Sequence, residues 1–202
     1  MPVAPINFDR VIKRLSGSST AFADIFFEEK CVSTLIFENR RVDRVRQGVD
    51  CGIGLRIIKD NRTYYGFTTD LTQESIDELS YSLLEASGGA SGTADVSLRP
   101  RSCLSFAPIE IDPSSYGFKD KIDLLVEADD AARSYGPEIK QVRVILMDEK
   151  RRIFQVNSEG SLIDFEKTIV TFVTHVTSAK DSILQTGYES AGGQFGMEFF
   201  KT

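Results

Sequence analysis

Histidine and cysteine are the side chains of this chain best suited to metal or nucleophilic chemistry, and both are scarce. The single histidine, His175, lies within the run IVTFVTHVT. A catalytic zinc ion needs about three protein ligands and a position open to water, which one histidine cannot supply. Because His175 alternates with apolar residues, we interpret it as a strand residue facing solvent or a neighbouring side chain. No Gly-x-Ser-x-Gly motif occurs either, so the sequence predicts no catalytic residues and no metal ligands.

The cysteines offer no alternative centre. Cys31, Cys51 and Cys103 are odd in number and widely spaced, which fits neither a disulfide framework nor a Cys-x-x-Cys metal or redox motif. We expect them to be reduced thiols in a cytoplasmic protein.

Two glycine clusters and two carboxylate pairs are the remaining candidates. Gly52-Ile53-Gly54 and the run from Gly192 to Gly196 lack the Gly-x-Gly-x-x-Gly spacing of a dinucleotide site, and we interpret both as turns or bulges. The neighbours Glu28 and Glu29, and Asp129 and Asp130, should point to different faces of their elements. Neither pair can therefore act as a general acid and base by itself.

Composition excludes two broad classes of function. The net charge is −6 and the isoelectric point is near 5.0, which disfavours nucleic acid as a partner. A basic cluster, Arg40, Arg41, Arg44 and Arg46, is flanked by Glu38 and Asp43 and is typical of a solvated strand face. No apolar run reaches 18 residues, and the N-terminus lacks the uninterrupted apolar core of a signal peptide. We expect a cytoplasmic protein with no membrane partner.

Periodicity predicts the elements of the first half. Apolar residues one helical turn apart predict a short helix over residues 8–15, ended by the Ser-Gly-Ser-Ser run at 16–19. A meander of four or five strands follows, with reversals at Asn61 and in the region 48–54. Asp70 and Thr72 are plausible N-caps of a second helix, which Gly88 and Gly89 end.

The second half repeats this alternation. Residues 88–117 hold several prolines, serines and glycines and predict an extended excursion with short strand pieces near 96–98 and 109–111. A third helix is predicted over about 118–135. Three strands follow: 142–146, then IFQV across a DEKRR turn, then a long threonine-rich strand.

Runs of consecutive strands bracketed by helices predict an α+β fold. We expect a largely antiparallel sheet built from two strand meanders, with about three helices packed on it.

The sequence resembles the TldD/PmbA family, whose members were named modulators of DNA gyrase and are zinc-dependent peptidases. The resemblance begins in the segment from FADIFFEEK to YYGFTTD and includes the strand pair VNSEGSLIDFEKTIVTFVTHV. It is most specific in GYESAGGQFGMEFF. The matching positions, which we interpret as structural, are Gly52, Gly54, Arg56, Gly66, Phe67, Asp70, Gly192, Gly193, Gly196, Glu198 and Phe199.

The resemblance implies that residues 1–202 are the N-terminal domain of a TldD-type metallopeptidase. The family carries zinc on a His-Glu-x-x-x-His helix, assisted by a later cysteine, and both lie C-terminal to the position that matches Thr202. No cofactor is therefore expected in this chain, and zinc is expected in a C-terminal catalytic domain. The implied partners are that domain, a second TldD/PmbA-type subunit and unfolded peptide substrates.

Two hypotheses of function remain open at this stage. One is a peptide-handling and assembly domain of a peptidase; the other is a stand-alone interaction module or regulator. The strands 168–177 and 22–30 could hold an extended peptide if either lies at a sheet edge, and a partner subunit could cover the same edge instead.

Overall fold

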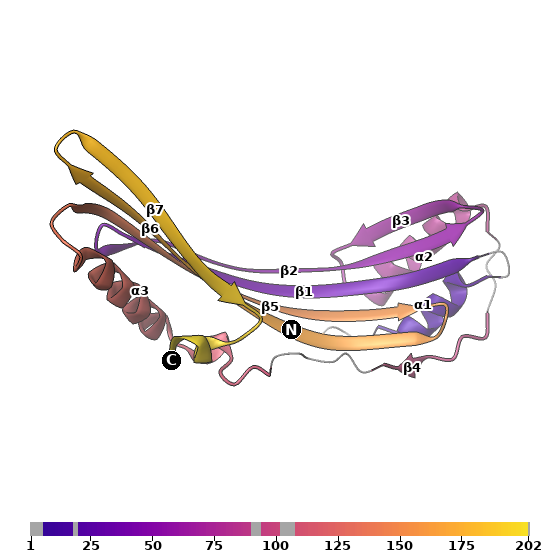
Figure 1. Ribbon diagram of the computed structural model, residues 1–202. Coiled ribbons are helices and arrows are strands. Elements are labelled where there is room, and N and C mark those ends of the chain that lie inside the picture. Colours follow the sequence, from indigo (N-terminus) through magenta and orange to yellow (C-terminus); the bar gives the residue numbers. More distant parts are fainter. Residues whose placement is uncertain (1–5, 18–19, 90–93, 102–107, 202) are drawn as a thin grey trace. The chain divides into compact units, whose positions relative to one another are not determined.

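The structure is a computed structural model that describes residues 6–17, 20–89, 94–101 and 108–201. The chain divides into two compact units (Figure 1). Unit 1 comprises Met1–Lys30, Asp50–Leu104 and Arg151–Glu166, and unit 2 comprises Cys31–Val49, Ser105–Lys150 and Lys167–Thr202. Cys103 lies outside the described residues, and Cys31 and Cys51 are free thiols.

The described residues form three α-helices and one seven-stranded sheet. The helices are α1 (Phe8–Leu15), α2 (Gln73–Ala86) and α3 (Phe118–Arg133), and short 3₁₀ helices are η1 (Pro113–Ser115) and η2 (Met197–Lys201). The strands are β1 (Phe22–Glu38), β2 (Arg41–Lys59), β3 (Arg62–Thr68), β4 (Arg99–Pro100), β5 (Ile139–Asn157), β6 (Ser161–Lys180) and β7 (Ile183–Gly193). Their order is β3-β2-β1-β5-β6-β4, with β7 paired to β6. This confirms the predicted α+β class with a largely antiparallel sheet.

The first meander has fewer and longer strands than we predicted. The reversal at Asn61 is confirmed, because Asp60 and Asn61 both have positive φ, as a tight two-residue hairpin loop requires. The reversal predicted within 48–54 is wrong. Gly52 and Gly54 lie inside β2, where Ile53 pairs with Thr68 and Gly54 with Phe67 of β3, so the ladder holds the glycines in extended backbone.

The predicted DEKRR turn is also wrong, because β5 runs through it without a break. The charged side chains of this segment form ion pairs with other elements and do not project into solvent from a loop. In unit 2, Lys150 contacts Asp112 at 3.1 Å. In unit 1, Arg151 contacts Glu28 at 3.5 Å and Arg152 contacts Asp164 at 3.1 Å.

Strand β7 was not predicted. It returns antiparallel along β6, from Lys180 opposite Ile183 to Val170 opposite Gly193, after a two-residue loop in which Asp181 has φ of 54°. Of the two short strands expected in residues 88–117, the one near 96–98 corresponds to β4, which begins one residue later and pairs in parallel with Ser161 and Leu162 of β6. The one near 109–111 is wrong, because residues 108–112 form no strand.

The edges of the sheet differ from the two candidates named from sequence. Strand β1, which contains residues 22–30, lies between β2 and β5, and residues 170–177 of β6 pair with β7. Among the described strands, β3, β4 and β7 each have a neighbour on one side only.

Each unit has its own apolar core. In unit 1, α1 and α2 pack on the sheet (Figure 1), and the core includes Val11, Leu15, Ile25, Leu55 and Ile76. In unit 2, α3 packs on the sheet around Leu125, Val144, Leu146, Val170 and Met197. Each helix buries one stripe and leaves the opposite stripe in water, as its periodicity predicted. No helix among the described residues is long and apolar enough to cross a membrane.

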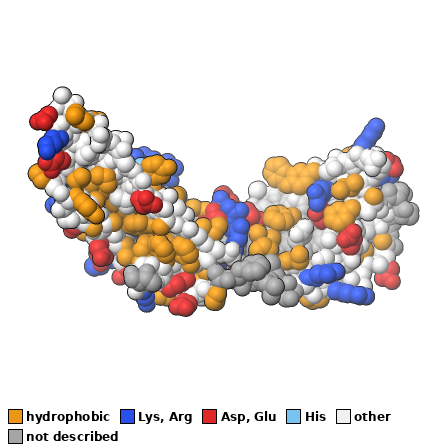
Figure 2. Space-filling view, viewed as in Figure 1, with side chains coloured by type: hydrophobic (Ala, Val, Ile, Leu, Met, Phe, Trp, Pro, Cys, Tyr) orange, Lys and Arg blue, Asp and Glu red, His pale blue; other side chains and the backbone are white. Residues whose placement is uncertain are grey.

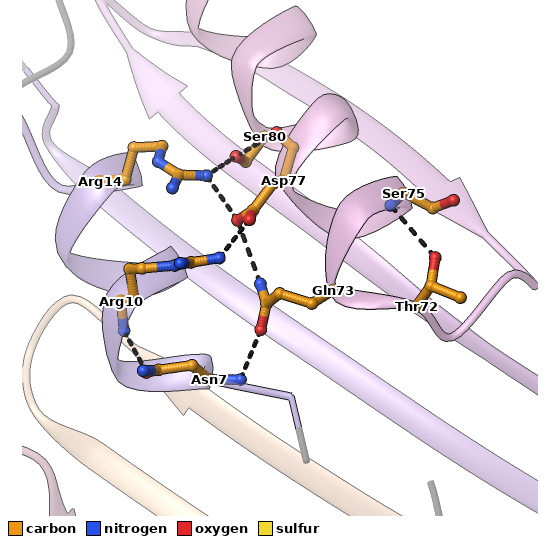
Figure 3. Close-up of polar contacts among 8 residues, drawn as sticks. All are labelled: Asn7, Arg10, Arg14, Thr72, Gln73, Ser75, Asp77 and Ser80. Atoms are coloured by element: carbon orange, nitrogen blue, oxygen red, sulfur yellow. Dashed lines mark hydrogen bonds and ion pairs between the residues drawn. The ribbon is translucent and has the colours of Figure 1, made fainter. Parts of the chain in front are cut away.

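A polar network ties α1 to α2 on the surface of unit 1 (Figure 3). Asp77 of α2 accepts hydrogen bonds from Arg10 and from Arg14, the latter at 2.7 Å. Arg14 also donates to the Ser80 hydroxyl at 2.7 Å. The Arg14 side chain is only 12% exposed, so the loss of Asp77 would leave a nearly buried cation without a counter-ion.

We therefore expect Asp77→Ala to lower the free energy of unfolding by about 1–3 kcal/mol. The adjacent, exposed Glu78 supplies the control, because Glu78→Ala should change the free energy of unfolding by less than about 0.5 kcal/mol. Urea denaturation followed by circular dichroism measures both. Equal effects of the two substitutions would show that the network does not stabilise the helix pair.

Candidate functional site

Five of the family-motif positions lie together on β2 and β3 of unit 1. Gly54 is paired with Phe67, Leu55 with Gly66, and Arg56 with Tyr65. Side chains alternate between the two faces of a strand. Because Ile53 and Leu55 are buried in the unit 1 core, Gly52, Gly54 and Arg56 belong to the opposite, outer face.

Two of these glycines let a neighbouring side chain lie close to the sheet, one on each of its faces. A Cβ at Gly66 would lie 2.7 Å from Cδ1 of Leu79 of α2, so this glycine lets the helix pack on β3. A Cβ at Gly54 would lie 2.7 Å from the Tyr65 hydroxyl and 3.0 Å from its ring. Tyr65 therefore lies over Gly54 on the outer face.

Arg56 belongs to an ion pair on the same face. Its guanidinium donates two hydrogen bonds to the Asp24 carboxylate, at 2.9 and 2.6 Å, and it lies 5.7 Å from the centre of the Phe22 ring. The hydrogen bond with Asp24 raises the pKa of Arg56 in spite of partial desolvation. The bidentate geometry fixes β2 against β1 and leaves Arg56 with its charge balanced.

Asp70 organises the start of α2. Its carboxylate accepts a hydrogen bond from the Ser75 hydroxyl at 2.6 Å and from the Thr72 amide at 3.2 Å. The Ser75 bond lowers the pKa of Asp70 more than desolvation raises it. Thr72 is the N-cap and accepts from the Ser75 amide, so of the two predicted caps Thr72 fills the position itself and Asp70 supports it.

The second motif group, Gly192, Gly193, Gly196, Glu198 and Phe199, lies in unit 2. Gly192 and Gly193 are the last residues of β7, and the turn that we predicted there begins after them. Glu198 accepts hydrogen bonds from the amides of Gly196 at 2.6 Å and Ile111 at 2.9 Å. Phe199 stacks on Phe195 with ring centres 4.6 Å apart. The two motif groups thus belong to different units, and each has contacts that stabilise its own unit.

Unit 2 also contains a cavity of about 530 Å³ that sequence reasoning missed. Lys121 of α3 donates to Asp148 of β5 at 2.6 Å in its wall, and both side chains are nearly buried. Lys150 donates to Asp112, whose pKa is lowered by the Ser114 hydroxyl and by Lys150 against the effect of burial. These paired charges fix α3 and η1 on the sheet. No sequence signal connected residues so far apart.

His175 does not assemble a metal site with its neighbours. As predicted, it is exposed on β6, with its ring 5.7 Å from that of Tyr188. It lines a hollow with Glu38, Gln141 and Arg143, but the Glu38 carboxylate is already bonded by Gln141 and lies 3.9 Å from Arg143. Zinc needs about three ligands, and this donor set does not fit it. No group of three or more metal-ligating side chains occurs among the described residues.

Comparison with known proteins identifies both halves of the chain. Residues 23–80 match PmbA/TldA metallopeptidase domain 1, and residues 111–202 match the PmbA/TldA metallopeptidase central domain. The fold thus combines two successive domains of a class of metallopeptidases. The chain belongs to the PmbA/TldD family.

Curated relatives match nearly the whole chain but are much longer than it. It is 24% identical over 181 residues to a metalloprotease of Methanothermobacter thermautotrophicus, with 89% of the chain and 39% of that protein covered. It is 22% identical over 194 residues to a metalloprotease TldD homolog of Buchnera aphidicola, with 94% of the chain and 39% of that protein covered. The chain thus spans about two fifths of the length of these relatives.

Solved structures share the fold. A protein of Bacteroides thetaiotaomicron described as a modulator of DNA gyrase superposes with a TM-score of 0.71 at 15% identity, over 95% of this chain and 45% of that one. TldE from Thermococcus kodakarensis gives a TM-score of 0.67 at 14% identity, over 93% of this chain and 43% of that one.

The Glu198 contacts make the stability of unit 2 depend on pH. Desolvation raises the pKa of Glu198, but hydrogen bonds from backbone amides, including those of Gly196 and Ile111, lower it further, and the net shift is downward from 4.5. A carboxylate with a lowered pKa in the folded state stabilises that state above the ordinary pKa. This contribution is lost as the pH falls below about 4.5.

We expect Glu198→Gln to cost about 1 kcal/mol at pH 7 and to flatten the dependence of stability on pH between 5 and 3. The exposed Glu127 of α3 is the control, because Glu127→Gln should leave both unchanged. Thermal unfolding at a series of pH values measures this. An unchanged pH profile in Glu198→Gln would contradict the assigned role.

Proposed function

We propose that this chain is the non-catalytic, peptide-handling part of a metal-dependent peptidase, and that β7 holds an unfolded substrate by adding it to the sheet as a further strand. Membership of a metallopeptidase family supports the first part. The relatives that share this fold are more than twice as long as the matched region, so we place the zinc ligands and the cleavage chemistry outside these residues.

The free edge of β7 supports the second part of the proposal, the addition of a substrate strand to the sheet. All its residues from Ile183 to Gly192 are exposed, and β6 is its one strand neighbour in the described part of the chain. Soluble proteins usually protect such an edge with lysine, proline or a bulge. The sequence ILQTGYESAGG contains one charged residue, Glu189, and no proline or lysine. An edge of this kind favours strand addition.

The register defines which backbone groups are available. Lys180 and Ile183 flank a two-residue loop, so they form a hydrogen-bonded pair, and such pairs alternate with non-bonded pairs along β7. The amides of Leu184, Thr186, Tyr188, Ser190 and Gly192 therefore point away from β6. A peptide can bond to them through its backbone alone, without selection for its side chains.

Binding should be weak. Each backbone hydrogen bond contributes a net of about 1 kcal/mol, and association itself costs at least about 4 kcal/mol. About eight such bonds, to the outward carbonyls as well as the outward amides of β7, leave a net of about 4 kcal/mol, which corresponds to a dissociation constant in the millimolar range.

We expect unrelated extended heptapeptides to bind with dissociation constants that agree within about threefold, near the millimolar range. The same peptides N-methylated on consecutive amides should not bind, because they lack donors. Ser190→Pro removes an outward amide and should weaken binding about fivefold, as the loss of about 1 kcal/mol requires. Ser190→Thr keeps the amide and is the matched control. Isothermal titration calorimetry measures these affinities.

The proposal fails if no peptide binds, if one side-chain sequence is strongly preferred, or if the methylated peptides bind as well as the others. A second subunit could pair with the same edge through its own strand. In that case Ser190→Pro would shift a concentration-dependent dimer toward monomer in sedimentation experiments, and the Ser190→Thr protein would not shift.

A further inference from the structure

The outer face of unit 1 carries an aromatic hollow of about 220 Å³ that the proposed function does not use. Phe26 of β1 and Tyr65 and Phe67 of β3 provide its rings, and Gly52 and Gly54 of β2 also line it. Figure 2 shows hydrophobic side chains at the surface over β3. We call this feature the aromatic hollow.

The three aromatic rings of the hollow are much more exposed than rings in an apolar core. Phe67 is 70% exposed, Tyr65 63% and Phe26 41%, although aromatic residues normally bury much of their surface. Tyr65 and Phe67 stack with ring centres 6.5 Å apart, and the missing side chain at Gly54 makes room for the Tyr65 ring. The rings are thus held in place and open to solvent, as a recognition surface requires.

Carboxylates give the aromatic hollow a negative character. Glu28 and Asp50 both line it. Glu28 contacts Arg151 at 3.5 Å, and the charge of the nearby Arg56 is balanced by Asp24. Asp50 is exposed, and its carboxylate has no hydrogen-bond or ion-pair partner among the residues that the structure describes.

We infer that the aromatic hollow binds the guanidinium or ammonium group of a basic side chain on a partner polypeptide. A cation is attracted to the face of an aromatic ring, and the Asp50 carboxylate adds an opposite charge at the end of the same hollow. The exposed faces of the Tyr65 and Phe67 rings offer apolar surface to the stem of an arginine or lysine side chain. A nucleic acid could stack on the same rings, but Asp50 and Glu28 would repel its phosphates.

This inference does not depend on the peptide edge. The aromatic hollow lies in unit 1 and β7 in unit 2, so substitutions in one should not alter binding at the other. Failure of either proposal leaves the other standing.

The test compares two blocked pentapeptides, Gly-Ser-Arg-Ser-Gly and the same sequence with citrulline, which keeps the shape of arginine without its charge. Binding to the 202-residue chain is measured by NMR from the ring resonances of labelled tyrosine and phenylalanine. The arginine peptide should bind at least fivefold more tightly and shift the Tyr65 and Phe67 signals. Phe67→Leu and Asp50→Asn should each weaken it about threefold.

Tyr135→Leu removes a ring that is 90% exposed in unit 2, and Glu78→Gln removes an exposed charge in unit 1; neither should affect binding. If the protein without substitutions binds the arginine and citrulline peptides with equal affinity, the inference is wrong, whatever the variants show. It would also be overturned if an oligothymidylate or a phenylalanine pentapeptide bound as tightly as the arginine peptide.

Discussion

The structure depends on a two-residue alternation of core residues that β1 and β5, strands of 17 and 19 residues, keep through both units. In β1, Ala23 and Ile25 are in the core of unit 1, and Leu35 and Phe37 are in the core of unit 2. All four are odd-numbered. In β5 the core residues Val144 and Val156 are even-numbered, again one in each unit. A slip of one residue would turn every later apolar side chain to the wrong face.

This constraint explains which sequence predictions succeeded. The three helices were predictable because each has its own apolar stripe and its own end signals, such as Thr72, and these are local. The Asn61 reversal is local in the same way. The supposed turns at Gly52 to Gly54 and at DEKRR were misread, because pairing with β3 and the ion pairs of Lys150, Arg151 and Arg152 override local turn propensity.

The candidate sites were less predictable than the fold. The sequence placed Gly54 and Phe67 in one motif, but only strand register sets them opposite each other and lays Tyr65 over the glycine. Strand β7 was missed since its mixed composition, ILQTGYESAGG, contains few of the apolar residues that mark a strand with one face in a core. Strand β7 was difficult to predict because it is exposed from Ile183 to Gly192. The same exposure makes it the strongest candidate for binding a further chain.

Amide hydrogen exchange along β7 tests the central proposal of strand addition most directly. At a saturating concentration of an unfolded peptide, the outward amides of Leu184, Thr186, Tyr188 and Ser190 should exchange several times more slowly than in the free protein. The amides of Gln185, Gly187 and Glu189, which bond to β6 in the derived register, should change little. Protection that appears elsewhere in the chain while the outward amides of β7 exchange as before would contradict the account.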